Sequence, residues 1–281
     1  MGKFAILAIL MSYFITLTCT AQVTNLPLPV KQGEYLIFDK PDANHIEKDS
    51  LPSAMQDPFP PESSNGNGVQ AGKAKGFDWK GAAKQSLFLL AIMHSYNFGT
   101  SAGARGELRG PFFKDYFRSV RNLRGWNDGD PFIANYVGHP MQGAVAGYIQ
   151  IQNDPKGRGQ EFAMSKAYWN SRLKAAGFAL LFSTQWEIGP LSEASLGNIG
   201  LKPFENSKHP MAWGDIVITP TLGTAWLVGE DILDRFVIYK FENKFSNRLL
   251  RVLMRSFLNP SRTMANILRS EYPWHRDRRR L

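Results

Sequence analysis

Histidine and carboxylate residues that could support acid–base chemistry lie in predicted helices among mostly apolar neighbours. They are His139, Glu187, Asp215 and Glu230. A histidine beside a carboxylate can act as a general base, because the carboxylate orients the ring and stabilises the imidazolium form. We therefore assign His139 as a base, Glu187 or Asp215 as the group that orients it, and Glu230 as a further acid. The alternative is structural, since buried polar groups that satisfy one another can simply fix the register of packed helices.

Six further residues are candidates for binding a ligand, and several share a helix face with the catalytic candidates: His94, Asn97, Asn135, Gln142, Trp186 and Thr219. Ser183 lies one turn before Glu187 but lacks the strand–turn–helix context of a nucleophile elbow, which disfavours a serine hydrolase. His139, Glu187 and Asp215 could bind a metal in principle. However, no two of them occur at a metal-site spacing such as His-x-x-x-His. The sequence therefore predicts no metal site and no cofactor.

Two stretches, 135–147 and 215–229, carry most of these residues and match each other at an offset of 80 residues. Each has a polar residue, then His or Thr followed by Pro, then Gly: Asn135, His139, Pro140 and Gly143 against Asp215, Thr219, Pro220 and Gly223. The polar stripes are either thin solvent faces or groups presented to a cleft. If the two helices pack together, the stripes should face a common space shared with Glu187. If they lie apart, the repeat is only a recurring way to build a helix.

Helical periodicity extends over most of the chain after residue 77. It predicts a mainly α protein, a helical bundle with a pseudo-repeated pair of proline-containing helices, from segments 80–97, 112–123, 131–152, 160–188, 215–229 and 245–258. The β-branched residues 216–219 leave a strand possible there. Each repeat proline also frees the carbonyl four residues earlier, that of Tyr136 or Ile216, for a side chain to satisfy.

The N-terminus has the pattern of a secretory signal peptide in residues 1–21. Lys3 precedes an apolar run over 4–17, and Cys19-Thr20-Ala21 offers small residues for cleavage after Ala21. Lipidation at Cys19 is a less favoured alternative, because the residues before it do not fit a lipoprotein signal. An uncleaved anchor is disfavoured because a membrane span needs about 20 apolar residues. Cys19 is the only cysteine, so the mature chain cannot form disulfides.

The remaining chain divides by composition. Residues 22–76 are rich in proline, serine, asparagine and glycine, which predicts an extended or disordered leader. Residues 77–270 form the predicted α-helical domain, and residues 271–281 a basic tail for which disorder is the default. After residue 21 no uncharged apolar run reaches 18 residues, so an ordinary membrane span is not predicted.

The formal charge is +9, and it falls to +8 when Lys3 is removed with the signal peptide. This charge suits contact with anionic lipid or an envelope glycolipid, whereas nucleic acid is an unsuitable partner for an exported protein without a binding module. Arg248, Arg251 and Arg255 recur at helical spacing opposite apolar residues, which is typical of a helix that lies on a membrane surface. The alternative places these arginines in solvent on a helix packed against the bundle. The sequence indicates no protein partner.

Residues 135–230, about a third of the chain, resemble a bacterial exported family known as domain of unknown function 3943. The matching residues, in order, are Asn135, His139-Pro140, Gly143, Tyr148, Ser183, Trp186-Glu187, Glu193, Asp215, Thr219-Pro220, Gly223 and Gly229-Glu230. The family has no assigned activity. The resemblance therefore implies an envelope location and a shared site, but no chemistry.

Two functions fit these patterns. The first is a membrane-associated envelope protein whose paired helices form a polar cleft that binds lipid or an envelope component. The second is an enzyme that acts on lipid or cell-wall material with the His139–carboxylate cluster. Geometry discriminates between them, because His139, Glu187 and Asp215 can converge on an open cleft, lie apart, or be sealed in the core.

Overall fold

The computed structural model of the chain describes residues 76–100, 105, 111–121, 123, 126, 132–197 and 213–279. These residues all belong to one of two compact units in the chain. The predicted signal peptide, residues 1–21, lies outside the described residues, and so does the predicted leader 22–76 except for Gly76. The first described helix begins at Trp79.

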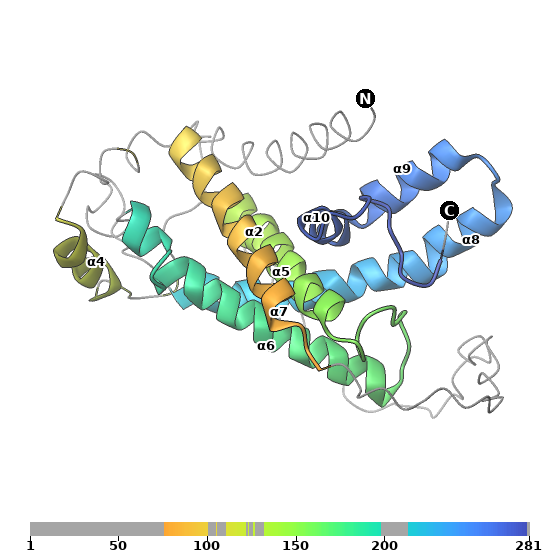
Figure 1. The fold of residues 1–281 in the computed structure, drawn as a ribbon, viewed down its shortest axis with the longest axis horizontal. Helices are drawn as coiled ribbons and strands as arrows, with labels where there is room; N and C mark the ends of the chain where they lie inside the picture. Colours follow the sequence, from red (N-terminus) through yellow and green to blue (C-terminus); the bar gives the residue numbers. More distant parts are fainter. Residues whose placement is uncertain are drawn as a thin grey trace, which may run out of the picture. The chain divides into compact units, whose positions relative to one another are not determined.

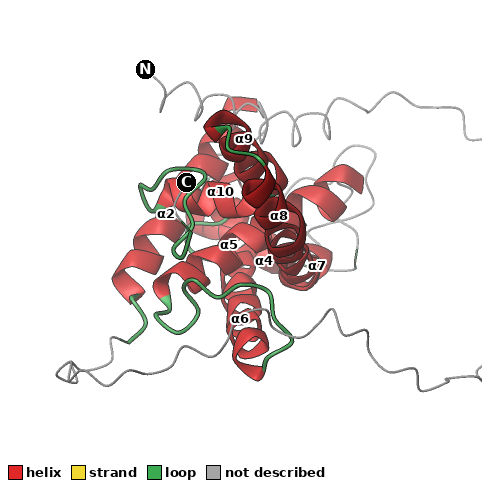
Figure 2. Ribbon diagram, turned by 90° about the vertical axis from the view of Figure 1, so that its right-hand side faces the viewer, coloured by secondary structure: helices red, strands yellow, loops and turns green. Residues whose placement is uncertain are grey.

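Helices make up most of the described part, and no strand occurs in it (Figure 2). The elements are α2 (Trp79–Thr100), α4 (Phe112–Arg121), η2 (Ala134–Gly138), α5 (His139–Asn153), α6 (Lys166–Ile188), η3 (Glu193–Gly197), α7 (Trp213–Leu233), η4 (Asp234–Ile238), α8 (Tyr239–Lys244), α9 (Arg248–Leu258) and α10 (Pro260–Leu268), with η denoting a π-helical turn. The predicted mainly α bundle is confirmed. The strand considered at 216–219 is instead part of helix α7, in which Ile216, Ile218 and Thr219 are buried and Val217 is exposed.

Helix α5 is the centre of the bundle, and every residue from Pro140 to Asn153 is buried. Helices α2, α6, α7 and α10 pack around it (Figure 1). Small residues occur among larger ones along α5, so neighbouring helices approach it closely and their side chains fill the core. The hydrophobic core of the bundle includes Leu89, Ala144, Val145, Ile149, Ala175, Ala179 and Leu227. Most polar residues of the first repeat therefore lie on a helix that has no solvent-exposed face.

The two repeat helices run parallel and in register. His139 meets Thr219, Gly143 meets Gly223, and Gly147 meets Leu227, so residue numbers rise together along both helices. A Cβ built at Gly223 would lie 2.8 Å from the Cα of Gly143, and one at Gly143 would overlap the carbonyl of Thr219. Glycine at both positions thus permits backbone contact, as in close helix pairs with small residues at the crossing.

A π-turn directly precedes the His139-Pro140 pair. The backbone N–H of His139 donates to the carbonyl of Ala134, five residues back, so η2 leads directly into α5. Pro220 lies inside α7, where the hydroxyl of Thr221 donates to the carbonyl of Val217 at 2.6 Å. Both prolines are therefore accommodated in continuous helices, and the first of them positions His139.

One helical segment is long and apolar enough to cross a membrane by length and composition. It runs without a break through α7, η4 and α8, from Trp213 to Lys244, over 32 residues. The expectation that no segment would qualify rested on counting uncharged residues. In the structure the acidic residues Asp215, Glu230, Asp231 and Asp234 are buried, so they do not interrupt the apolar exposed side.

Candidate functional site

His139, Glu187 and Asp215 come together from three different helices. His139 begins α5, Glu187 lies in the last turn of α6, and Asp215 lies in the first turn of α7. One ligand-type atom from each residue lies within 4.8 Å of the others. Helix α6 runs antiparallel to α5 and α7, which is why its C-terminal end meets their N-terminal ends. The convergence expected from the repeat and Trp186-Glu187 is confirmed.

The imidazole of His139 is held by contacts at both of its nitrogens. Its Nδ1 lies 3.3 Å from Oγ1 of Thr219, and its Nε2 lies 3.6 Å from Oδ1 of Asp215. Ser183 donates its hydroxyl to the backbone carbonyl of Asp215 at 3.1 Å, which joins α6 to the start of α7. Thr219 is the repeat equivalent of His139, so the in-register pairing itself creates the contact that orients the ring.

The cluster is nearly sealed rather than open. Glu187 and Asp215 are about one-twentieth exposed, and the side chain of His139 retains 13% exposure. The predicted cleft between the repeat helices is wrong for this segment, because the glycine contact of Gly143 and Gly223 brings the two backbones together and leaves no space. His139 is therefore the member of the cluster that is most accessible from outside.

The chain matches no family model, no curated protein and no solved structure. The resemblance of residues 135–230 to domain of unknown function 3943 stays a prediction. Chemically, an imidazole and two carboxylates can exchange a proton or bind a cation together. His139, Glu187 and Asp215 are the described residues that could bind a metal ion.

Three of the predicted binding residues form a second group around the C-terminal half of α2. His94 donates from Nε2 to the carbonyl of Leu191 at 3.2 Å, and its ring centre lies 4.7 Å from that of Trp186. Asn97 donates to Oε1 of Glu193 at 3.3 Å. Burial lowers the pKa of His94, partly offset by the carbonyl contact, so its imidazole is neutral near pH 7. These contacts fasten the segment after α6 to α2.

The remaining binding candidates flank His139. Asn135 precedes it by four residues and Gln142 follows it by three, so both lie on the same side of the helix as His139. Both side chains are more than nine-tenths buried. The Nε2 of Gln142 has no hydrogen-bond partner among the described residues. Together with Thr219, they give the surroundings of His139 a polar character.

Glu230 does not belong to this cluster, so its assignment as a further acid is wrong. It lies 15 residues after Asp215 on α7, which corresponds to about 22 Å along the helix. Its carboxylate accepts hydrogen bonds from the backbone N–H groups of Ser261 and Arg262 at 2.9 and 3.1 Å, and from Nε1 of Trp226 at 3.0 Å. Glu230 therefore caps the N-terminus of α10, where unpaired N–H groups and the helix dipole favour a carboxylate.

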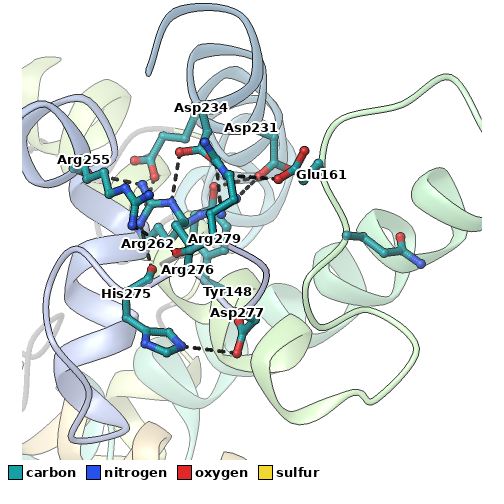
Figure 3. Close-up of polar contacts among 12 residues, drawn as sticks. Tyr148, Glu161, Asp231, Asp234, Arg255, Arg262, His275, Arg276, Asp277 and Arg279 are labelled. Carbon is teal, nitrogen blue, oxygen red and sulfur yellow. Dashed lines mark hydrogen bonds and ion pairs between the residues drawn. The ribbon is translucent and has the colours of Figure 1, made fainter. Parts of the chain in front are cut away.

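A buried network of arginines and carboxylates, which the sequence analysis missed, surrounds the C-terminal half of α7 (Figure 3). Asp231 accepts hydrogen bonds from Tyr148 and Tyr168 at 3.1 and 2.8 Å, and from Arg172 at 2.8 Å. Arg262 also donates to Asp231. The signal in the sequence was a set of acidic residues, 231, 234 and 242, in an otherwise apolar helix. Such residues are buried only when they are paired.

The basic C-terminal segments complete this network, which corrects two expectations. Arg255 of α9 is 1% exposed and pairs with Glu242, so it cannot contact lipid headgroups as predicted. In the tail, Arg276 donates to Asp234 at 2.9 Å and Arg279 contacts both Asp234 and Glu242. Residues 271–279 therefore pack on the bundle instead of being disordered, because buried carboxylates attract them.

A small cleft lies beside this network rather than at His139. Its cavity volume is about 30 Å³, and it is partly open to solvent. Residues from α5, α10 and the tail line it, including Tyr148, Gln152, Arg262, Asn266, Arg276 and Arg279. Burial lowers the pKa of Arg276 to about 10, with the charge of Asp234 opposing the decrease, so the guanidinium stays charged at neutral pH.

Proposed function

We propose that the protein is a membrane-associated helical protein of the bacterial cell envelope, with a polar site for lipid or an envelope component at one end of its bundle. The distribution of side chains along α7 and η4 carries this proposal. From residue 213 to 237 the exposed residues are apolar, except for a threonine: Trp213, Val217, Thr221, Leu222, Ala225, Ile232, Leu233, Phe236 and Val237. The acidic residues of the same segment all face inward.

This arrangement inverts the polarity of an ordinary surface helix. Water favours charged residues on the outer face, whereas hydrocarbon favours apolar residues outside and charges turned into the bundle. The segment 213–237 is about 37 Å long at 1.5 Å per residue, enough to cover a hydrocarbon layer of about 30 Å. Lipid acyl chains therefore suit this face.

The ends of the apolar face support the same assignment. Trp213 marks one end, and the exposed cations Lys240, Lys244 and Arg248 follow the other. Aromatic side chains favour the membrane interface, and lysine or arginine near a helix end can contact anionic headgroups. On α6, Leu173, Leu180 and Leu181 are exposed as well, so the apolar surface is not confined to one helix.

The His139 cluster is the proposed binding site for the polar part of the ligand. It lies at the Trp213 end of α7, where His139 is the partly exposed member. The predicted signal peptide and the family resemblance support an envelope location.

Flotation with lipid vesicles tests the membrane proposal. The protein, as processed by the producing cell, should float with anionic vesicles and stay bound at high salt, because apolar contact is not screened. Ile232→Glu should reduce flotation at least several-fold, whereas Asn170→Glu, which adds the same charge at an exposed polar position of α6, should not. Wild-type protein that stays at the bottom at low salt would refute the proposal. If Ile232→Glu floats like wild type, α7 is not the face involved.

An enzyme acting on lipid or cell-wall material is the second candidate. The observation in its favour is the alignment of Thr219, His139 and Asp215, in which the ring is oriented between a hydroxyl and a carboxylate. His139→Ala should abolish turnover of envelope lipid or glycan while the circular dichroism spectrum is kept. A variant that only melts at a lower temperature and retains function would make the cluster structural.

A further inference from the structure

We infer that His139, Glu187 and Asp215 bind one first-row divalent cation, with Zn²⁺ as the best-suited probe. The three side chains come from three helices, which is why no spacing in the sequence revealed them. Their ligand-type atoms lie within 4.8 Å of one another. The inference concerns the same cluster as the proposed function, but it does not depend on membrane association.

The distance between His139 and Asp215 fits two ligands of one ion. Nε2 and Oδ1 are 3.6 Å apart, longer than a good hydrogen bond between these atoms. Ligands at about 2.1 Å from a tetrahedral ion lie about 3.4 Å apart. The pair therefore needs only a small movement to coordinate a cation, and Glu187 supplies the third ligand after a change of side-chain torsion.

The orientation of the imidazole also suits coordination. Thr219 contacts Nδ1 at 3.3 Å, which directs Nε2 towards Asp215. A metal-binding histidine commonly uses its second nitrogen in a hydrogen bond that fixes the tautomer and the ring plane. Thr219 is fully buried, so this contact is protected from water. We assign Thr219 as a positioning residue for the site.

The types of ligand indicate which ion suits the site. The cluster offers one imidazole nitrogen and two carboxylate groups. Imidazole favours Zn²⁺ and related transition ions, whereas Ca²⁺ and Mg²⁺ prefer sets of oxygen ligands.

The proposed set of three ligands does not fill the coordination sphere of a tetrahedral ion. Three protein ligands are typical of zinc sites that keep a position for water or substrate. His139 is the most exposed of the three, and the buried amide of Gln142 lies one turn away with its Nε2 unpartnered among the described residues.

Metal titration of the full chain in detergent, without a histidine tag, tests the inference. After treatment with a chelator, the protein should bind one equivalent of Zn²⁺, and its melting temperature should rise with zinc concentration. His139→Gln, Glu187→Gln and Asp215→Asn should each weaken binding by more than about 100-fold, since changes outside the ligand set alone cost about 10- to 100-fold. His275→Gln is the matched control, because His275 also lies 3.5 Å from the carboxylates of Glu271 and Asp277 but outside the cluster, and it should bind like wild type.

Thr219 gives a variant that keeps all three ligands. Thr219→Val should weaken zinc binding about 10- to 100-fold without changing the melting temperature of the zinc-free protein, and Thr219→Ser should restore affinity. A purely structural role of Thr219 would instead lower the melting temperature and leave affinity unchanged, which would overturn its assignment.

If the ligand variants do not fold, the wild-type protein alone can test the metal site. Zinc-edge X-ray absorption should show one imidazole and oxygen ligands at about 2.0–2.2 Å, with no sulfur. Failure to bind stoichiometric Zn²⁺, or undiminished binding by a folded His139→Gln variant, overturns the inference. Vesicle flotation is read separately, so either proposal can fail alone.

Discussion

The two ends of the continuous helix formed by α7, η4 and α8 both bury carboxylates, but the charged groups around these carboxylates differ. At the C-terminal end Asp231, Asp234 and Glu242 are surrounded by guanidinium groups, with Arg276 at 2.9 Å from Asp234. At the N-terminal end, Asp215 and Glu187 face the imidazole of His139. Arginine is always charged at physiological pH, whereas histidine can be charged or neutral and can bind a metal.

This difference separates a permanent structural network from an adjustable site. The arginine network joins α7, α9, α10 and the tail through contacts that do not change with conditions near neutral pH. The His139 cluster can change its charge by gaining a proton or a cation. A binding or catalytic role therefore suits the N-terminal end, and a role in stability suits the C-terminal end.

The largest expected effect comes from comparing Asp231→Asn with Asp215→Asn. Asp231 is 1% exposed and accepts hydrogen bonds from two tyrosines and from Arg172 and Arg262. Its neutral amide would leave buried guanidinium groups uncompensated, at a cost of about 3–5 kcal/mol in the free energy of unfolding. Asp215→Asn removes a negative charge beside Glu187, so we expect a change within about 1 kcal/mol in the absence of metal.

Urea unfolding in detergent with chelator present, followed by circular dichroism, measures both values. Two variants that lose similar stability would break the comparison, because both ends would then be structural. If Asp215→Asn by itself is strongly destabilised, the His139 cluster is structural.

Much of the fold follows from patterns that the sequence displays. Helical periodicity identified the bundle, and the offset between Thr219 and His139 identified a pair of helices. The repeat had predictive value because Gly143 and Gly223, which recur with it, permit the parallel contact that brings the two polar stripes together. A pairing encoded by small residues and hydrophobic faces can be recognised locally.

The arginine network could not be predicted in the same way. Arg255 and Arg276 have amphipathic or solvent-facing patterns, and their burial depends on where Asp234 and Glu242 lie in three dimensions. Glu230 was misassigned for a related reason, because its partners are backbone N–H groups of a helix that begins 30 residues later. Long-range charge pairing leaves no fixed spacing in the chain.

An intermediate effect is expected for Glu230→Gln. The amide keeps one acceptor for the N-terminus of α10 but loses the charge that interacts with the helix dipole, so stability should fall by about 1–2 kcal/mol. Zinc binding and vesicle flotation should be unchanged. If Glu230→Gln loses zinc binding without losing stability, Glu230 acts in the His139 site, and its assignment as a helix cap is wrong.

The smallest effect is expected from acid, at the exposed edge of the arginine network. Burial raises the pKa of Asp277, but the hydrogen bond from Arg158 and the charges of Arg269 and Arg158 lower it more, so the net pKa lies below its usual value of 3.8. A carboxylate with a depressed pKa contributes stability above the unfolded-state pKa and loses that contribution as pH falls through the folded-state value. Wild type should therefore be more stable than Asp277→Asn between pH 5 and 7, by less than about 1 kcal/mol because the side chain is partly exposed. The two melting curves should converge once the pH falls below the folded-state pKa of Asp277, which lies below 3.8. If the stability difference between wild type and Asp277→Asn is independent of pH, Asp277 acts through packing. Only the buried ion pairs of the arginine network would then differ in kind from the His139 cluster.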